Sequence, residues 1–243
     1  MVKSILLALL LVPVMAFASN EIKLDTAPVD LHDTISLQRG VHIFINYCLT
    51  CHNAAYMRYN RLQDLGLSEE QIKDNLMFAV AKRVGDTMTV AMDKNDAKDW
   101  FGATPPDLSL IARSRGADWL YTYLRGFYRD NTTHTGWNNT VFSRVGMPHV
   151  LHELQGVQAL KTEVQTDAHG HKREVQNLVL EKPGMLTPTQ YDMLVADLVN
   201  YLVFMAEPAK TFRLQLGIFV LFFLAIAFVV TYMLKKEFWK DVH

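Results

Sequence analysis

The sequence predicts a mostly α-helical domain that carries a small β-hairpin insertion and ends in a single membrane-spanning helix. Three observations support this class. Apolar residues recur at the helical period along several segments, and residues 161–183 place strand-forming residues on both sides of a turn. Residues 216–234 form a run of 19 residues without a charged side chain. Because a helix of roughly 20 residues crosses the hydrocarbon of a bilayer, this run indicates a membrane span.

Residues 1–18 have the three parts of a secretory signal peptide. Lys3 supplies the positive start, residues 5–12 are apolar, and Ala-Phe-Ala at 16–18 places small residues before a cleavage site. An uncleaved anchor is the alternative, but the apolar run is short for a bilayer span. We therefore expect the domain that begins at residue 19 to be exported.

The first helix of that domain is expected to begin near Ser36 and to deliver Cys48 and Cys51 at its end. Two cysteines three apart, with His52 directly after the second, are typical of covalent haem attachment. Each thiol adds to one vinyl group, and the histidine becomes the proximal iron ligand. A disulfide or half of a zinc site is the alternative, but the sequence offers no second ligand pair at zinc spacing. We predict one haem c.

Further helices are expected along the chain. Gly40 would allow the first helix to cross a C-terminal helix closely, as in small c-type cytochromes. Residues 54–62 are expected to be helical near the haem edge. A capping box, Ser-Glu-Glu-Gln at 68–71, predicts a helix that ends at Gly85. The last helix, 188–207, has proline at its first position, and together these segments predict a common core.

The sequence ATPPDLS predicts a rigid extended turn into a helix capped by Asp107 or Ser109. That helix carries Arg113 and Arg115, and an arginine near a buried haem commonly pairs with a propionate. A solvated surface position is the alternative for either arginine. The next helix, 118–128, is rich in aromatic residues, which suits the wall of a planar cofactor or an ordinary core.

Local sequence leaves the second axial ligand open. A methionine ligand gives an electron carrier of raised potential, whereas iron held by His52 alone would suit a haem sensor or gas-binding module. Met147 lies between a glycine and a proline, which give room and rigidity beside a ring. Met185 lies just before the last helix, where simple one-haem cytochromes often place their ligand. Other histidines in the chain are His134, His149 and His152.

Residues 161–183 predict a β-hairpin around the turn Asp-Ala-His-Gly at 167–170. His169 and His171 lie on or beside this turn and could bind a metal. Two ligands alone do not define a metal site, so a polar turn is the better interpretation.

The apolar run extends to a predicted membrane helix, 212–234, followed by a cytoplasmic tail, 235–243. Lys235 and Lys236 come directly after the run, as expected of a cytoplasmic end. A buried core helix is disfavoured because no polar stripe interrupts the run. The signal peptide and the haem motif then place the domain 19–211 in the periplasm, beside a bacterial inner membrane.

The charge of the chain bears on its partners. The net charge is −1, and acidic side chains modestly outnumber basic ones in the exported part. This balance argues against a nucleic-acid partner and mildly favours a basic protein partner through electrostatic steering. An ordinary solvated surface fits the same charge.

Four pieces of the sequence occur in a fixed order: RGVHIFINYCLTCHNAAYMRYNRL, PPDLSLIARSRGADWLYTYL, VGMPHVL, and a helix ending in MAEP before a single span with a basic tail. Together these pieces resemble the cytochrome c1 family, the haem subunit of the ubiquinol–cytochrome c reductase (bc1) complex. The sequence departs from the family in three ways: Trp119 at a position where the family has tyrosine, a shorter region around residue 118, and the absence of the extra cysteine pair of some bacterial members.

The resemblance implies a mostly α cytochrome c-type haem domain that relays electrons from a Rieske iron–sulfur protein to a c-type cytochrome, in a complex with cytochrome b. The chain would not be catalytic alone. A membrane-anchored cytochrome subunit of a terminal oxidase is the rival, but it does not predict the PPDLS to GMP spacing. The haem-binding residues that the resemblance implies are Cys48 and Cys51 as thioether attachments, His52 and Met147 as axial ligands, and Arg115, with Arg113 as the alternative, on a propionate.

Overall fold

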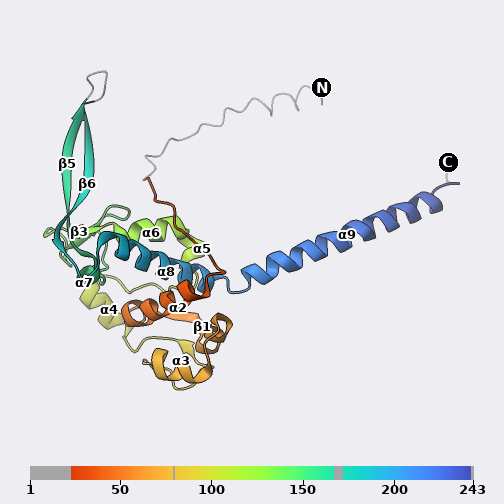
Figure 1. Ribbon diagram of the computed structural model, residues 1–243, viewed down its shortest axis with the longest axis horizontal. Helices are drawn as coiled ribbons and strands as arrows, with labels where there is room; N and C mark the ends of the chain where they lie inside the picture. The colour runs from red at the N-terminus through yellow and green to blue at the C-terminus, as the bar shows by residue number, and fades with distance from the viewer. Residues whose placement is uncertain (1–22, 79, 167–171, 242–243) are drawn as a thin grey trace.

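Two helices from opposite ends of the sequence, α2 (Thr34–Ile43) and α8 (Pro188–Ala206), cross at the centre of the domain in the computed structural model (Figure 1). Gly40 permits the crossing, because a Cβ atom there would meet the Asp197 carbonyl oxygen and lie 2.6 Å from the Tyr201 Cβ. Arg39 donates to both carboxylate oxygens of Asp197 across the same contact. The close crossing expected from Gly40 is therefore present.

The structure describes residues 23–78, 80–166 and 172–241. The expected signal peptide, 1–18, and the histidines His169 and His171 lie outside these residues. About half of the chain is helical and the strands form small antiparallel pairs, which confirms the predicted fold class. The remaining elements are a π-helical turn η1 (Phe44–Cys48), β1 (Ala54–Arg58), a 3₁₀ helix η2 (Tyr59–Leu65), α3 (Glu69–Leu76), β2 (Thr87–Met88), α4 (Lys94–Phe101), α5 (Ile111–Arg115), α6 (Ala117–Arg125), β3 (Phe127–Arg129), β4 (Trp137–Asn139), α7 (His152–Gln155), β5 (Gly156–Thr166), β6 (Lys172–Pro183) and α9 (Lys210–Phe238).

The prediction of a helix over residues 54–62 is wrong. The chain there forms β1, which pairs with β2, and only then turns into η2. The Ala55 N–H donates to the Asp107 carboxylate and the Tyr56 N–H donates to the Ser109 hydroxyl. Because these donors are satisfied by distant side chains, the segment stays extended instead of closing helical hydrogen bonds.

The helix that starts at the Ser68 capping box ends at Leu76, not at Gly85. The capping box itself forms as predicted, since Ser68 and Gln71 exchange hydrogen bonds. Farther on, the Lys82 and Arg83 N–H groups both donate to one Asp86 carboxylate oxygen, which fixes a turn in place of a last helical turn.

Three other details differ from the prediction. Asp107 and Ser109 do not cap α5, whose N-terminal residue Leu110 makes no side-chain cap, because both side chains bind elsewhere. The aromatic helix ends at Arg125, and residues 127–129 pair with β4 as a short strand. Helix α4 was not predicted, because its eight residues are too short and polar to show helical periodicity.

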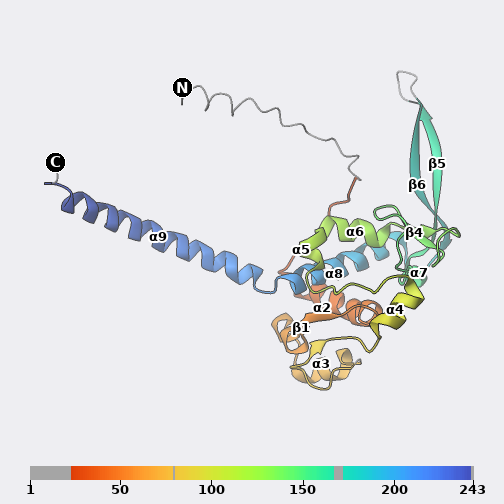
Figure 2. The ribbon, with the colours of Figure 1, turned by 180° about the vertical axis from the view of Figure 1, so that it is seen from behind.

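The predicted hairpin is present and is longer than expected, with β5 paired to β6 from Gly156 outward. At its base Gly156 has φ +96°, and a Cβ there would lie 2.6 Å from the Gly184 nitrogen, so the two strands start in close contact. The Gln158 amide donates to the Phe127 carbonyl oxygen and ties β5 to β3. Figures 1 and 2 show the hairpin projecting clear of the helical body.

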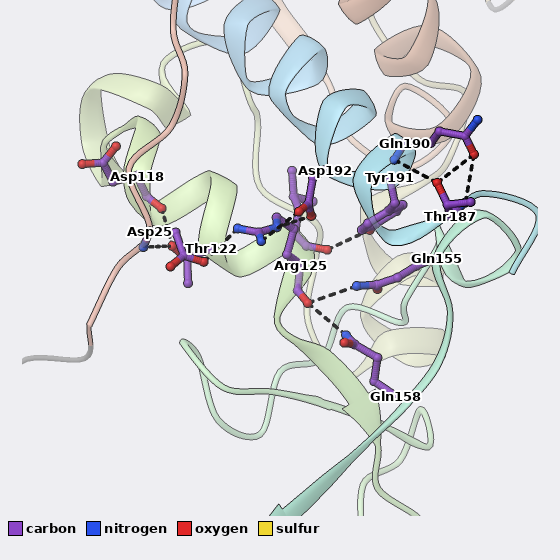
Figure 3. A network of polar contacts seen from close by, with 11 residues as sticks. Asp25, Asp118, Thr122, Arg125, Gln155, Gln158, Thr187, Gln190, Tyr191 and Asp192 are labelled. Atoms are coloured by element: carbon purple, nitrogen blue, oxygen red, sulfur yellow. Dashed lines mark hydrogen bonds and ion pairs between the residues drawn. The ribbon is translucent and has the colours of Figure 1, made fainter. Parts of the chain in front are cut away.

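Arg125 at the end of α6 connects three parts of the chain (Figure 3). Its guanidinium donates to Asp192 of α8 at 2.6 Å and to Asp25 of the N-terminal segment at 2.8 Å. Its carbonyl oxygen accepts hydrogen bonds from the side chains of Gln155 and Gln158. This residue therefore links the N-terminal segment, the last helix of the domain and the base of the hairpin.

Helix α9 stands apart from the domain in both ribbon views (Figures 1 and 2). Its segment Phe212–Phe238 has 27 residues, and the most apolar 18 of them have a mean hydropathy of 2.6 and no buried side chains. At about 1.5 Å per residue it is roughly 40 Å long, which is enough to cross a bilayer. The helix continues past residue 234, the predicted end, through Lys235 and Lys236 to Phe238.

Candidate haem-binding site

A cavity of about 320 Å³ opens between η1, helices α5, α6 and α8, and the loop that contains residues 145–148. Most of the side chains that line it are apolar, including Leu198 and Leu202 of α8 and Val145 and Val150 of the loop. The residues that line it come from parts of the chain that are far apart in sequence, from Tyr47 to Leu202. The cavity is therefore a site built by the tertiary fold.

Cys48 and Cys51 lie at one edge of this cavity, at the end of η1. The N–H groups of Cys51 and His52 both donate to the Cys48 carbonyl oxygen, at 3.1 and 2.9 Å, and close a tight turn that keeps the two side chains on one side. The two cysteines do not form a disulfide with each other, so each sulfur is available for a thioether bond. Burial raises the pKa of Cys48 to about 12, so this thiol is neutral in its apolar surroundings.

His52 also lines the cavity, and its Nδ1 atom lies 2.8 Å from the Pro106 carbonyl oxygen. A carbonyl oxygen can only accept, so Nδ1 carries the proton and donates. Burial lowers the pKa of His52, which keeps the imidazole neutral. The Nε2 lone pair is then free to bind a metal, in the arrangement usual for metal-binding histidines.

The turn that carries Pro106 is pinned to the haem-motif loop by further hydrogen bonds. The Leu108 N–H donates to the Asn53 carbonyl oxygen at 2.8 Å, and Asp107 accepts from the Ala55 N–H at 2.9 Å. Asp107 also accepts from the Ser109 N–H at 2.8 Å. The acidic and hydroxyl residues of the PPDLS sequence therefore fasten this turn beside His52.

Met147 lines the same cavity, whereas Met185 is 78 % exposed and is not part of it. The Met147 sulfur accepts a hydrogen bond from the Tyr123 hydroxyl at 3.4 Å. A thioether is a soft ligand that suits haem iron opposite an imidazole. Of the two methionines that local sequence left open as the second axial ligand, Met147 lines the cavity that contains His52 and Met185 does not.

The two candidate arginines also separate. Arg115 borders the cavity, and its guanidinium carbon lies 5.1 Å from the centre of the Trp119 ring and 6.0 Å from that of Phe142. Arg113 is exposed on α5 and does not border the cavity. An arginine at the rim of an apolar cavity can pair with a carboxylate of a bound ligand.

Sequence reasoning missed part of the cavity wall. Phe101 ends the unpredicted helix α4, and Phe142 lies in the connection between β4 and α7. Neither residue belongs to a periodic pattern, so no local signal marks it as a wall residue. The aromatic wall expected from α6 is present, since Trp119 and Tyr123 both line the cavity.

The groups gathered at this cavity fit one kind of cofactor. Two thiols at haem-motif spacing, an imidazole with a free Nε2 and a thioether line a mostly apolar space. Thiols can form thioether bonds with the haem vinyl groups, the imidazole nitrogen and the thioether sulfur can bind iron, and apolar walls can pack against a porphyrin ring. The arrangement defines the class of c-type cytochromes.

Comparison with known proteins narrows this class. The family described as "Cytochrome C1 family" matches residues 25–242. A protein named "Ammonia monooxygenase gamma subunit" from Nitrosomonas europaea is 52 % identical over 100 % of this chain and 99 % of its own. "Cytochrome c1" of Allochromatium vinosum is 47 % identical over 97 % and 96 % of the two chains. "Cytochrome c1" of Rhodospirillum rubrum is 29 % identical over 87 % and 83 %.

The chain belongs to the cytochrome c1 family. It is accordingly an electron-transport protein with one covalently bound haem c. Cytochrome c1 is the haem subunit of the bc1 complex, which implies cytochrome b and a Rieske protein as partners. The bacterial relatives and the apolar helix α9 fit a membrane-anchored protein.

Proposed function

We propose that this chain relays single electrons from a Rieske iron–sulfur protein to a c-type cytochrome within the ubiquinol–cytochrome c reductase complex. The observation that supports this best is that His52 and Met147 line one apolar cavity together with both cysteines. Iron with an imidazole and a thioether ligand has no open position, so it carries electrons rather than binding small molecules.

In this proposal Cys48 and Cys51 form the two thioether bonds, and His52 binds iron through Nε2. Met147 is the distal ligand, and Arg115 pairs with a propionate. The bound haem supplies the one-electron couple. The protein's own part is to hold the His52 imidazole through Pro106, to exclude water with the apolar wall and to neutralise charge at the rim.

The same proposal gives the chain its topology. Residues 1–18 are a signal peptide, and the haem domain, 19–211, lies in the periplasm. Helix α9 crosses the inner membrane and the tail after residue 234 is cytoplasmic. The support is the length of the apolar segment Phe212–Phe238 and the lysines at its C-terminal end.

Co-purification from membranes tests the function. The tagged full-length chain, extracted in mild detergent, should bring down a cytochrome b and a Rieske protein. In that complex a quinol should reduce the haem within one turnover, and removal of the Rieske protein should abolish this reduction. Isolation of the chain with oxidase subunits, or rapid binding of carbon monoxide by the reduced haem, would contradict the proposal.

A second candidate follows from the 52 % identical relative, whose name assigns it to an ammonia monooxygenase. In that case the same haem site would serve a complex that contains monooxygenase subunits. The co-purification experiment separates the two, because monooxygenase subunits would then appear in place of cytochrome b. The family match and the 47 % identical cytochrome c1 favour the bc1 complex.

A further inference from the structure

We infer that Tyr123 is a positioning residue for Met147: its hydroxyl donates a hydrogen bond that orients the thioether sulfur and raises the reduction potential of the haem. This inference rests on the proposed function, in which Met147 is the distal ligand. Tyr123 itself would not touch the iron. Its effect would act through the sulfur.

The contact joins the Tyr123 hydroxyl and the Met147 sulfur at 3.4 Å, with both residues lining the cavity. The direction of the hydrogen bond is fixed, because a thioether sulfur has no proton to donate. The sulfur has two lone pairs. Accepting from the hydroxyl uses one and leaves the other for a metal.

The Tyr123 ring is held by neighbours on both sides. It stacks on Trp119 with ring centres 4.7 Å apart and planes at 11°, and it meets the edge of Phe127 at 5.1 Å and 69°. The Tyr123 carbonyl oxygen accepts from the Asn139 side chain at 2.7 Å. With the backbone and the ring fixed in this way, the position of the hydroxyl is set by packing before any ligand binds.

The hydroxyl also stays a donor. The Tyr123 side chain is buried, and a phenol hydroxyl ordinarily keeps its proton at neutral pH. A hydrogen bond draws electron density away from the sulfur and makes it a weaker donor to oxidised iron. Since hydrogen bonds in the second shell tune a metal centre, the reduced state gains relative to the oxidised state.

Tyr123→Phe tests this in the detergent-solubilised complex that contains the full chain. Tyr121→Phe is the matched control, because it removes a phenol hydroxyl from the same helix at the same 9 % exposure but outside the cavity. The midpoint potential of Tyr123→Phe should be lower than that of the wild type, while that of Tyr121→Phe should be unchanged. Equal potentials in the two variants would overturn the inference.

The visible spectrum separates this outcome from a failure of the proposed function. Oxidised wild-type protein should show the weak red band of a thioether–iron bond, Met147→Leu should lack it, and Tyr123→Phe should keep it. A wild type without the band would overturn the ligand assignment and this inference together. Equal potentials with the band intact overturn the inference alone.

One measurement needs no variant. Transfer of the wild-type complex to D₂O, with oxidation and reduction cycles to allow exchange, should shift the iron–sulfur stretching band in resonance Raman spectra. This is expected because the deuterated hydroxyl is bonded to the sulfur. An unshifted band after complete exchange would count against the hydrogen bond even if Tyr123→Phe failed to assemble.

Discussion

The Nδ1 atom of His52 lies 2.8 Å from the carbonyl oxygen of Pro106, and this contact joins the haem motif to the PPDLS turn. A proline has no N–H, so Pro106 can offer only its carbonyl group here. The contact fixes both the tautomer and the ring plane of the imidazole. Two motifs that are separate in the sequence therefore form one unit at the edge of the cavity.

The first prediction concerns the residue that fastens this turn. Asp107→Ala removes acceptors for the N–H groups of Ala55 and Ser109, so it should cost about 1–2 kcal/mol in free energy of unfolding. Asp107→Asn keeps one acceptor oxygen and should lose about half as much. Thermal unfolding and haem content of the purified protein measure the effect. Asp74→Ala, at an exposed position on α3, is the control and should match the wild type.

The second prediction separates the two methionines. Met147→Leu should lower the reduction potential and let the reduced haem bind carbon monoxide, because it would leave an open iron position. Met185→Leu should do neither, since Met185 is 78 % exposed and outside the cavity. Redox titration and carbon monoxide difference spectra check both variants. The opposite pattern would show that Met185 is the ligand.

The third prediction concerns the helix crossing. Gly40→Ala would force a Cβ against the backbone of Asp197 and the Cβ of Tyr201, so α2 and α8 would have to separate. Such overpacking costs about 1–3 kcal/mol, and the lower unfolding temperature should come with loss of haem because η1 follows α2 directly. Gly85→Ala is the matched control, with nothing within 4 Å of its Cβ. Equal stability of the two variants would argue against a tight crossing.

Much of this fold could be predicted because local chemistry decides it. The Ser68 and Gln71 capping box and Pro188 at a first helical position each predict a helix start that the structure contains. The hairpin and the apolar C-terminal helix also follow from local pattern. The spacing of Cys48, Cys51 and His52 carries a chemical requirement that no context changes, and all three line the cavity as expected.

The remainder depends on partners far away in the sequence. Residues 54–58 are extended because Asp107 and Ser109 accept hydrogen bonds from the N–H groups of Ala55 and Tyr56. The local sequence of this segment gives no sign of these distant partners. Gly85 was expected to end a helix that in fact stops at Leu76, and farther on Asp86 accepts hydrogen bonds from the N–H groups of Lys82 and Arg83. That Met147 lines the cavity and Met185 does not likewise depends on the tertiary position of each side chain.

The last prediction concerns Arg125, whose guanidinium lies 4.4 Å from the Tyr121 ring centre and bonds to Asp192 and Asp25. Arg125→Met keeps most of the side-chain volume but leaves two partly exposed carboxylates without a partner. We expect a loss of about 1–2 kcal/mol in free energy of unfolding, reduced from buried-pair values because solvent screens both acids.

Salt separates the causes of this loss. The part that comes from the ion pairs should shrink at high ionic strength, whereas the part from ring contact should not. Arg83→Met is the control, because Arg83 is 85 % exposed and its 3.5 Å pair with Asp86 should be worth less than about 0.5 kcal/mol. Thermal unfolding at low and high salt measures both variants. If Arg125→Met proved no more destabilising than Arg83→Met, the hydrogen bonds and ion pairs of Arg125 in Figure 3 would not contribute to the free energy of unfolding.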